Sequence, residues 1–400
     1  MFTLPNSEAV EFLVGTREQL AELPDVGVLP AYSDLVLDFL SDLSAELLSM
    51  PKTRDFSDVA AFAFFIRRSA LRNLKAENLP RQRRIGRGVA LHIAPSNVPV
   101  NFAVSLMDGL LAGNANVVRV SNKPFEQVAM ICAAMNRLLS GKFKSLARYV
   151  NVVRYDHSEE ITSALSSICD VRVVWGGNRT IREIRKSPLP PRAVEMCFAD
   201  RHSILVINAD NYLSHVAEMV ARGFYIDTFH TDQNACSSPR LVVWTGSRVE
   251  EAKARFWGEL KKLVDRDYSM PPIKAVDKLD AFCRLAADFG DVTRVVDGNA
   301  IVRVQLGRIT SGIMDYKEGA GFFFEYTARA LDEILPVLNK PCQTISYLGV
   351  DPDEIERLVV ENGVRGCDRI VPLGKTMDLS VLWDGYNMVE SMSRLVDKRR

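Results

Sequence analysis

Cys236 is the residue of this chain whose setting most favours covalent chemistry. It lies within residues 232–239, among small and polar side chains, directly before an apolar run at 241–244. A structural cysteine usually has large apolar neighbours, whereas a nucleophilic thiol needs amide donors, small neighbours that admit a substrate and some access to solvent. The setting of Cys236 therefore predicts a nucleophile. The alternative interpretation is a tight turn that carries a buried thiol.

Asn97 is the second candidate for a chemical role. The apolar alternation at 89–93 predicts a strand, Pro95 and Pro99 break it into a turn, and a helical pattern follows as far as Gly113. Asn97 should therefore lie in the loop between a strand and a helix, where functional groups of α/β folds collect. Its side-chain amide can donate to a developing oxyanion; the alternative is a turn residue without further function.

The elements that must position these residues alternate along the chain. Leucines at helical spacing predict helices within 33–78, and from residue 89 onward strands alternate with helices. This alternation predicts a parallel, doubly wound sheet. An extended connector at 187–191 is followed by an apolar run at 204–207, which we interpret as the last strand of that sheet, and a helix from 211 leads toward Cys236.

Three blocks of sequence resemble the aldehyde dehydrogenase superfamily and, within it, the bacterial long-chain acyl-CoA reductases, the LuxC-type fatty-acid reductases of bioluminescence systems. They are the Asn97 loop with its continuation at 110–119, the block at 232–239 and the tail at 368–386. They occur in the order found in the family and span nearly the whole chain. The tail is what favours this branch over other aldehyde dehydrogenases.

The resemblance implies an α/β fold of two doubly wound domains, each a three-layer αβα sandwich. Residues 1–208 would hold a helical N-terminal region and the nicotinamide-nucleotide domain, residues 209–375 the catalytic domain and residues 376–400 a C-terminal segment. Cys236 would attack an acyl thioester to form an acyl-cysteine, which NADPH reduces to the aldehyde. The Asn97 amide and the Cys236 backbone N–H would hold the oxyanion.

The cofactor residues follow from the same resemblance. The chain has no G-x-G-x-x-G motif, but Gly176 and Gly177 stand between a predicted strand and a predicted helix, where backbone amides could approach a pyrophosphate. The second glycine that the superfamily has five residues further on is missing. Arg119, Ser121 and Lys123 correspond to the segment that grips the adenosine ribose, and cations there favour NADPH over NADH.

The general base has three candidates. Glu195 matches the superfamily's glutamate after the cofactor sheet, although the Gly-Gly-Lys expected just beyond it is absent. His202 ranks second. His230, six residues before Cys236, ranks third as a base, and it could also lower the pKa of the Cys236 thiol.

Two further features bear on the acyl donor. A basic stretch before the first strand could receive an acidic carrier protein, an acyl-transferring partner enzyme or the phosphates of CoA, or could be a solvated helix face; it comprises Arg67, Arg68, Arg72, Lys75, Arg81, Arg83, Arg84 and Arg87. Aromatic residues could line an acyl tunnel or simply pack in the core; they are Phe322, Phe323, Phe324, Tyr326, Trp383 and Tyr386. A homo-oligomer is expected by resemblance.

Bulk composition narrows the setting. Lys plus Arg and Asp plus Glu each total 50, so no charge bias favours nucleic acid. Seven cysteines without paired metal-ligand spacing favour a reducing cytoplasm and no metal site. The start of the chain has no basic segment leading into an apolar core, and the longest uncharged apolar run, 59–66, is too short to span a bilayer.

Two alternative functions stay open at this stage. A short-chain, CoA-acylating aldehyde dehydrogenase that uses NAD would share the chemistry. A catalytically silent subunit that binds acyl groups or nucleotide within a complex would not, and the presence of both Asn97 and Cys236 argues against it.

Overall fold

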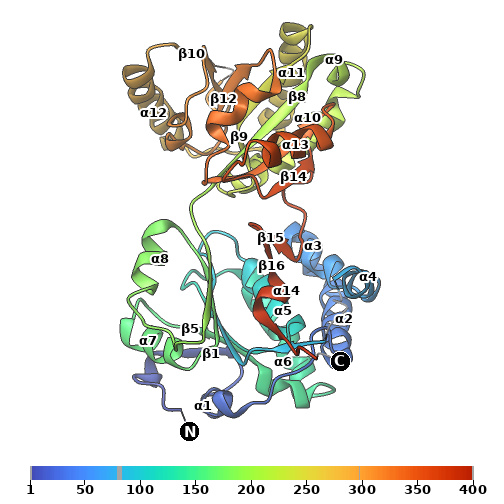
Figure 1. Cartoon of the computed structure of the whole chain (residues 1–400), viewed down its shortest axis with the longest axis vertical. Coiled ribbons are helices and arrows are strands. Elements are labelled where there is room, and N and C mark those ends of the chain that lie inside the picture. Colours follow the sequence, from blue (N-terminus) through green and yellow to red (C-terminus); the bar gives the residue numbers. More distant parts are fainter. Residues whose placement is uncertain (1, 79–82, 297, 399–400) are drawn as a thin grey trace. The chain divides into compact units, whose positions relative to one another are not determined.

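Two parallel sheets, each in its own compact unit, organise the chain in the computed structural model (Figure 1). The structure describes residues 2–78, 83–296 and 298–398. The first unit comprises residues 1–199 and 379–400, and the second comprises residues 200–378. Within the described residues, no helix is both long and apolar enough to cross a membrane.

The first sheet has six strands. Their order is β1 (Glu11–Val14), β5 (Val150–Arg154), β4 (Ala115–Val120), β3 (Val89–Ile93), β6 (Val171–Trp175) and β7 (Val194–Phe198). All neighbours are parallel except the edge strand β1. β3 and β6 are buried along their whole length, which explains their nearly continuous apolar sequences, since helices cover both faces of a parallel sheet.

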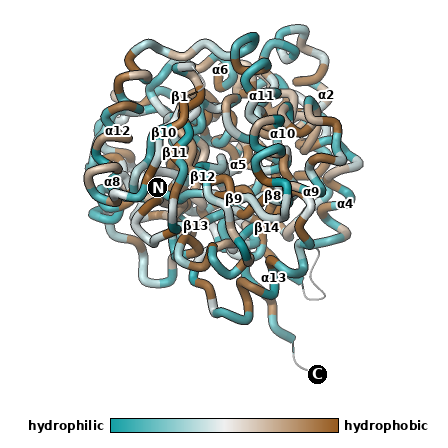
Figure 2. Tube along the Cα trace, turned by 90° about the horizontal axis from the view of Figure 1, so that it is seen from above, coloured by the Kyte–Doolittle hydropathy of each residue, from teal (hydrophilic) through white to brown (hydrophobic). Residues whose placement is uncertain are grey.

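Helices of the first unit pack around this sheet. They are α1 (Arg17–Glu22), α2 (Asp34–Ser49), α3 (Ser57–Phe65), α4 (Arg68–Asn78), α5 (Asn101–Leu111), α6 (Glu126–Ser140), α7 (Glu159–Ser167) and α8 (Asn178–Ile184). The outer helices carry hydrophilic and hydrophobic residues in turn (Figure 2), as expected of helices that bury one face only.

The winding of the first sheet reverses between β3 and β6. The chain runs from β3 through α5 to β4 on one side, and from β6 through α8 to β7 on the other. Because such crossovers are right-handed, α5 and α8 must cover opposite faces, and Figure 1 shows them on opposite sides of the sheet. Ligands of doubly wound folds bind at the carboxyl ends of the strands beside such a reversal.

The end of the chain completes the first unit. Hairpin β15 (Leu382–Trp383) and β16 (Tyr386–Asn387) leads into α14 (Met388–Met392), and β17 (Ser393–Leu395) pairs with β2 (Arg84–Gly86). Met388, Val389 and Met392 are buried in the core of the first unit. The C-terminal segment is therefore part of the first unit and its core.

The second sheet has seven strands. Their order is β10 (Val292–Val296), β11 (Val302–Leu306), β12 (Phe322–Thr327), β9 (Pro239–Thr245), β8 (His202–Asn208), β13 (Cys342–Leu348) and β14 (Arg369–Pro372). Only β10 is antiparallel to its neighbour. α9 (Ala209–Tyr212), α10 (Ala217–Asp227) and α11 (Val249–Asp267) pack on one face. α12 (Ile273–Phe289), α13 (Pro352–Glu361) and the 3-10 helix η7 (Leu331–Val337) pack on the other.

The strand at 204–207 differs from our expectation. The sequence suggested the last strand of the first sheet, but β8 lies between β9 and β13 in the second, and the chain passes between units near residue 199 rather than 208. An apolar run shows that a strand is buried without showing which strands pair with it. The strand at the other edge of the first sheet, opposite β1, is β7. Most of its residues are only partly buried, so its sequence lacks the apolar run that predicts a strand.

Candidate functional site

Cys236 lies in a short turn at the amino end of β9. The turn follows the 3-10 helix η5 (Phe229–Thr231), and the Ser238 N–H closes it by donating to the Ala235 carbonyl oxygen at 3.0 Å. Cys236 itself is half-buried. The fold thus presents the thiol on a loop of small residues, at the opposite end of the sheet from the carboxyl edge.

Most other cysteines are unsuited to nucleophilic chemistry. Burial raises the pKa of Cys132, Cys169 and Cys367 to about 12. Cys197 is half-buried like Cys236, but burial and then the Glu195 carboxylate raise the pKa of its thiol to about 11. A buried thiol is a poor source of thiolate, so these cysteines have structural roles.

Gln233 fastens the Cys236 turn to the sheet. Its side chain is 1% exposed, and its Nε2 donates to the carbonyl oxygens of Pro239 and Phe322, both at 3.1 Å. Its Oε1 accepts from the backbone N–H groups of Gly321 (3.0 Å) and Phe322 (3.1 Å). These four bonds hold Gln233 in the left-handed region, with φ 58°, which is costly for a residue with a Cβ.

Arg240, which was not among the residues predicted from the sequence, places a cation within electrostatic range of the thiol. It is the second residue of β9, and its Nε is buried without a hydrogen-bond partner among the described residues. Burial lowers the pKa of its guanidinium, whereas the nearby Cys236 sulfur, Asp200 and Glu318 act in the opposite sense. A cation next to a sulfur favours the thiolate.

His202 lies at the same end of the second sheet as Cys236. It is the first residue of β8 and is buried, and its ring Nε2 lies 3.0 Å from the Val337 carbonyl oxygen, so Nε2 carries the proton. Burial lowers the pKa of this imidazole to about 4, so it is neutral near pH 7. His230 lies in η5 and is exposed.

Asn97 lies in the loop between β3 and α5, as predicted, at the carboxyl edge of the first sheet. Its side chain is exposed, and its amide makes no hydrogen bond within the part of the chain that the structure describes. The amide is therefore available to a ligand.

A buried polar network lies below this loop. His92 of β3 is fully buried, with Nδ1 2.7 Å from the Ser105 hydroxyl and Nε2 3.1 Å from the Asn116 side-chain oxygen. The Trp175 indole N–H donates to the same Ser105 oxygen at 2.9 Å. Burial lowers the pKa of His92 to about 4. The network joins β3 to α5 and to β6. β3 and β6 are the two strands that flank the reversal.

Lys123 and Arg119, the two candidate cations for the ribose, differ in availability. The Arg119 guanidinium donates to the Tyr155 carbonyl oxygen at 3.1 Å and stacks over the Tyr155 ring. Lys123 is exposed, just beyond β4. The Ser121 hydroxyl accepts from the Lys123 backbone N–H at 3.2 Å and shapes this turn. Lys123 is therefore free to meet a ligand, while Arg119 is committed to the fold.

Gly176 and Gly177 follow β6 at the same edge. Gly177 caps α8, and a Cβ on Gly176 would lie 3.0 Å from the Thr180 methyl group, so a side chain there would require Thr180 to shift. Trp175 stacks on Phe198 with ring centroids 3.7 Å apart. The structure thus gathers Asn97, Lys123 and the glycine pair on neighbouring strand ends around the reversal between β3 and β6.

Glu195 does not lie at this carboxyl edge of the first sheet. It is the second residue of β7, near the amino end of the strand. Arg172 donates to one carboxylate oxygen at 2.5 Å and Arg185 to the other at 2.7 Å. Burial alone would raise its pKa, but these hydrogen bonds outweigh burial and lower it. A carboxylate held in this way fits a structural ion pair better than a general base.

The basic stretch separates into structural and exposed residues. Arg84 and Arg87 bond the C-terminal segment, and Arg68 and Lys75 pair with Asp38 and Asp34 of α2. Arg81 lies outside the described residues. The exposed remainder is Arg67, Arg72 and Arg83.

The aromatic candidates do not line one tunnel. Phe322 and Phe324 are buried against one face of the second sheet and Phe323 against the other. Trp383 and Tyr386 belong to the first unit, where they pack on Trp175 and Phe198. Among the described residues, no cluster of three or more His, Cys, Asp or Glu side chains could hold a metal ion.

Comparison with known proteins agrees with this architecture. A family model described as "Acyl-CoA reductase (LuxC)" matches residues 62–395. The long-chain acyl-protein thioester reductase of Photorhabdus luminescens is 29% identical over 323 residues, which cover 76% of this chain and 62% of that protein. The Vibrio harveyi protein of the same name is 29% identical over 172 residues, covering 42% and 34%. The chain thus spans about a third to three fifths of the length of these relatives.

Solved structures share the fold. Aldehyde dehydrogenase 21 from Physcomitrella patens superposes with a TM-score of 0.67 at 12% identity, covering 94% of this chain and 87% of that one. The 1-pyrroline-5-carboxylate dehydrogenase from Thermus with bound NAD gives 0.64 at 13% identity, covering 96% and 85%. These likenesses, together with the two parallel sheets, confirm the aldehyde dehydrogenase-like α/β fold.

Proposed function

The chain belongs to the acyl-CoA reductase (LuxC) family, and we propose from this membership and the geometry of the Cys236 turn that it reduces an acyl thioester to the aldehyde. The observation that carries the proposal is the half-buried thiol on a turn of small residues, fastened by Gln233 and within electrostatic range of the Arg240 cation. These are the conditions under which a cysteine forms a thiolate and admits a carbonyl carbon.

The chemistry begins with attack of the Cys236 thiolate on the thioester carbonyl carbon. A carbon–sulfur bond forms, the tetrahedral oxyanion collapses, and the donor leaves as a thiolate that takes up a proton. The Cys236 backbone N–H and the Asn97 amide are proposed to stabilise the oxyanion. A reduced nicotinamide nucleotide, when bound, supplies the hydride that turns the acyl-cysteine into a thiohemiacetal, whose collapse releases the aldehyde and the thiol.

The nucleotide is proposed to bind at the reversal between β3 and β6, where doubly wound folds place such ligands. Gly176 and Gly177 would let it approach the backbone, and Lys123 would contact the ribose. A 2′-phosphate next to an unpaired lysine favours NADPH. His202 is proposed as the proton acceptor in place of Glu195, because it is neutral near pH 7 and shares the amino edge of the sheet with Cys236.

The acyl donor is proposed to be carrier-bound. The matched relatives are named for acyl-protein thioesters, and Arg67, Arg72 and Arg83 present exposed charge to an acidic partner. Free acyl-CoA is the alternative donor.

Cys236→Ala tests the proposal most directly. Incubation with acyl-CoA or an acylated carrier protein should add one acyl group to the wild-type protein, as measured by intact mass, and none to the variant. Cys197→Ala, which removes another half-buried thiol, should acylate normally. Normal acylation of Cys236→Ala would reject the assignment of the nucleophile.

A further inference from the structure

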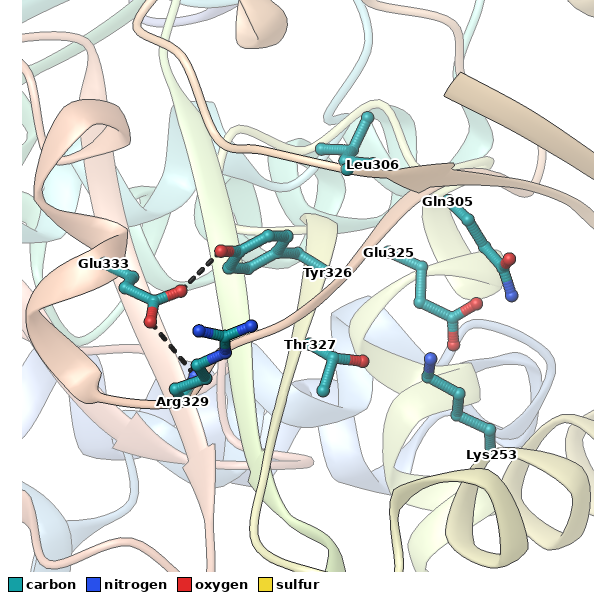
Figure 3. A pocket seen from close by; sticks show the side chains of 9 residues that line it. Lys253, Gln305, Leu306, Glu325, Tyr326, Thr327, Arg329 and Glu333 are labelled. Atoms are coloured by element: carbon teal, nitrogen blue, oxygen red, sulfur yellow. Dashed lines mark hydrogen bonds between the residues drawn. The ribbon is translucent and has the colours of Figure 1, made fainter. Parts of the chain in front are cut away.

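A polar cavity of about 420 Å³ lies at the carboxyl edge of the second sheet, at the opposite end of the strands from the Cys236 turn (Figure 3). It opens where β11 and β12 end, and its walls include Lys253, Gln305, Thr327 and Arg329. Its volume falls within the range of small-molecule sites. It lies wholly within the second unit.

The topology explains why a cavity forms here. After β9 the chain enters α11, which packs on one face of the sheet, whereas after the neighbouring strand β12 it enters η7 on the other face. α11 and η7 therefore contribute Lys253 and Glu333 to the cavity from opposite faces of the sheet, beside the carboxyl ends of β11 and β12. This is the kind of place at which doubly wound folds bind ligands.

The carboxylates of the cavity already have hydrogen-bond donors. Glu325, fully buried, accepts from the indole N–H groups of Trp244 (2.8 Å) and Trp257 (2.7 Å) and from Arg303 (3.2 Å). Glu333 accepts from the Tyr326 hydroxyl and from the Arg329 backbone N–H. Neither carboxylate needs a cationic ligand.

The unused hydrogen-bonding capacity consists mainly of donors. The Lys253 side chain is 10% exposed, and among the described residues its ammonium has one partner, the 83% exposed Glu250 carboxylate. The Arg329 guanidinium forms no ion pair or hydrogen bond with any described residue. Figure 3 shows both cations and the Thr327 hydroxyl at the cavity. A nearly buried ammonium with one solvent-exposed partner is costly, and an anion in the cavity would offset that cost.

We propose that this cavity binds a small polar molecule through its anionic group, a phosphate or a carboxylate, held between Lys253 and Arg329. Thr327 and Gln305 then bond the polar remainder of the ligand. The site is separate from the thioester chemistry at the amino edge of the same sheet, so it does not depend on the proposed function.

Isothermal titration calorimetry at constant ionic strength tests this site, with glycerol 3-phosphate, inorganic phosphate and malonate as probes. At least one probe should bind the wild-type chain. Comparing the affinities of the two phosphates with that of malonate shows which anion the cavity prefers. Arg329→Gln, at an exposed position, and Lys253→Met, which keeps the volume of the side chain, should each weaken binding by about tenfold or more, since each removes a charged donor.

Lys262→Gln is the matched control. Lys262 lies on α11, the helix that carries Lys253, but it is 71% exposed and pairs with Glu259. Its replacement should therefore leave probe binding unchanged. The proposal is overturned if none of the three probes binds, or if Arg329→Gln and Lys253→Met both bind as the wild type does. Arg329→Gln keeps the test decisive should Lys253→Met fail to fold.

Discussion

The Ser203 hydroxyl donates a 2.7 Å hydrogen bond to the Cys236 carbonyl oxygen, and its oxygen accepts from the Thr344 N–H at 3.2 Å. One side chain of β8 therefore joins the Cys236 turn to β13. The turn is fastened from two sides, because Gln233 bonds it to β9 and β12. A loop that must present a thiol in one orientation needs such support.

Ser203→Ala should disturb the turn more than the fold. We expect the free energy of unfolding to fall by about 1–2 kcal/mol, because the Ser203 hydroxyl makes two hydrogen bonds and each usually contributes about 1 kcal/mol. The acylation rate of Cys236 should fall by more than that loss explains. Denaturant unfolding and acylation kinetics measure the two effects. Ser346→Ala removes a comparable buried bond, from Ser346 to the Ile204 carbonyl oxygen, and should lower stability without slowing acylation.

Arg240→Gln should raise the pKa of the Cys236 thiol, because a nearby cation favours the charged form of a sulfur. The pH dependence of Cys236 alkylation by iodoacetamide measures this shift. Arg240→Lys keeps the charge and should restore most of the wild-type profile. Identical profiles for Arg240→Gln and the wild type would show that the cation does not act on the sulfur.

Asn97→Ala should lower turnover by about 10² to 10³ with little change in stability, as removal of one oxyanion donor does elsewhere. The exposed amide leaves no buried cavity when it is removed. Steady-state kinetics together with thermal unfolding separate the two effects. Ser96→Ala, in the same loop, serves as the control, and turnover of Asn97→Ala within about threefold of wild type would mean a turn residue only.

Lys123→Ala should raise the Michaelis constant for NADPH much more than that for NADH, since only NADPH carries the 2′-phosphate. Arg119→Ala should act differently. Its guanidinium holds the Tyr155 carbonyl oxygen, so its loss should lower the melting temperature and affect both cofactors alike. Equal effects of Lys123→Ala on the two cofactors would remove Lys123 from the ribose site.

His92 should make stability depend on pH. The pKa of the folded imidazole is about 4, against about 6.5 in an unfolded chain. Between these values the unfolded state binds more protons, so the free energy of unfolding should fall as the pH drops from about 6.5 to 4. His92→Gln cannot take up this proton. Its stability deficit relative to wild type should therefore narrow between pH 7.5 and 5, by on the order of 2 kcal/mol.

Urea unfolding at the two pH values measures this narrowing. His202 shares the same shift in direction, so comparing wild type with His92→Gln isolates the contribution of one residue. A constant deficit of His92→Gln would contradict the neutral buried imidazole.

The sequence by itself determined the alternating architecture and the local setting of Cys236 and Asn97. Both follow from short-range physics. Strands buried on both faces are mostly apolar, as β3 and β6 are apart from His92 and Arg172. Prolines break a strand, and small residues surround a turn whatever lies beyond it. The family resemblance rested on the same local blocks.

Tertiary structure decided which strands pair and which charges meet. β8 looks like any buried strand, and only long-range pairing with β9 and β13 assigns it to the second sheet. Glu195 was predicted as a candidate base, but in the structure Arg172 and Arg185, which are 23 and 10 residues away in sequence, donate hydrogen bonds to both of its carboxylate oxygens. The sequence offered Arg119 and Lys123 equally as ribose contacts, but in the structure the Arg119 guanidinium bonds the Tyr155 carbonyl oxygen. Burial and electrostatic neighbours depend on contacts between distant segments, which periodicity and spacing do not encode.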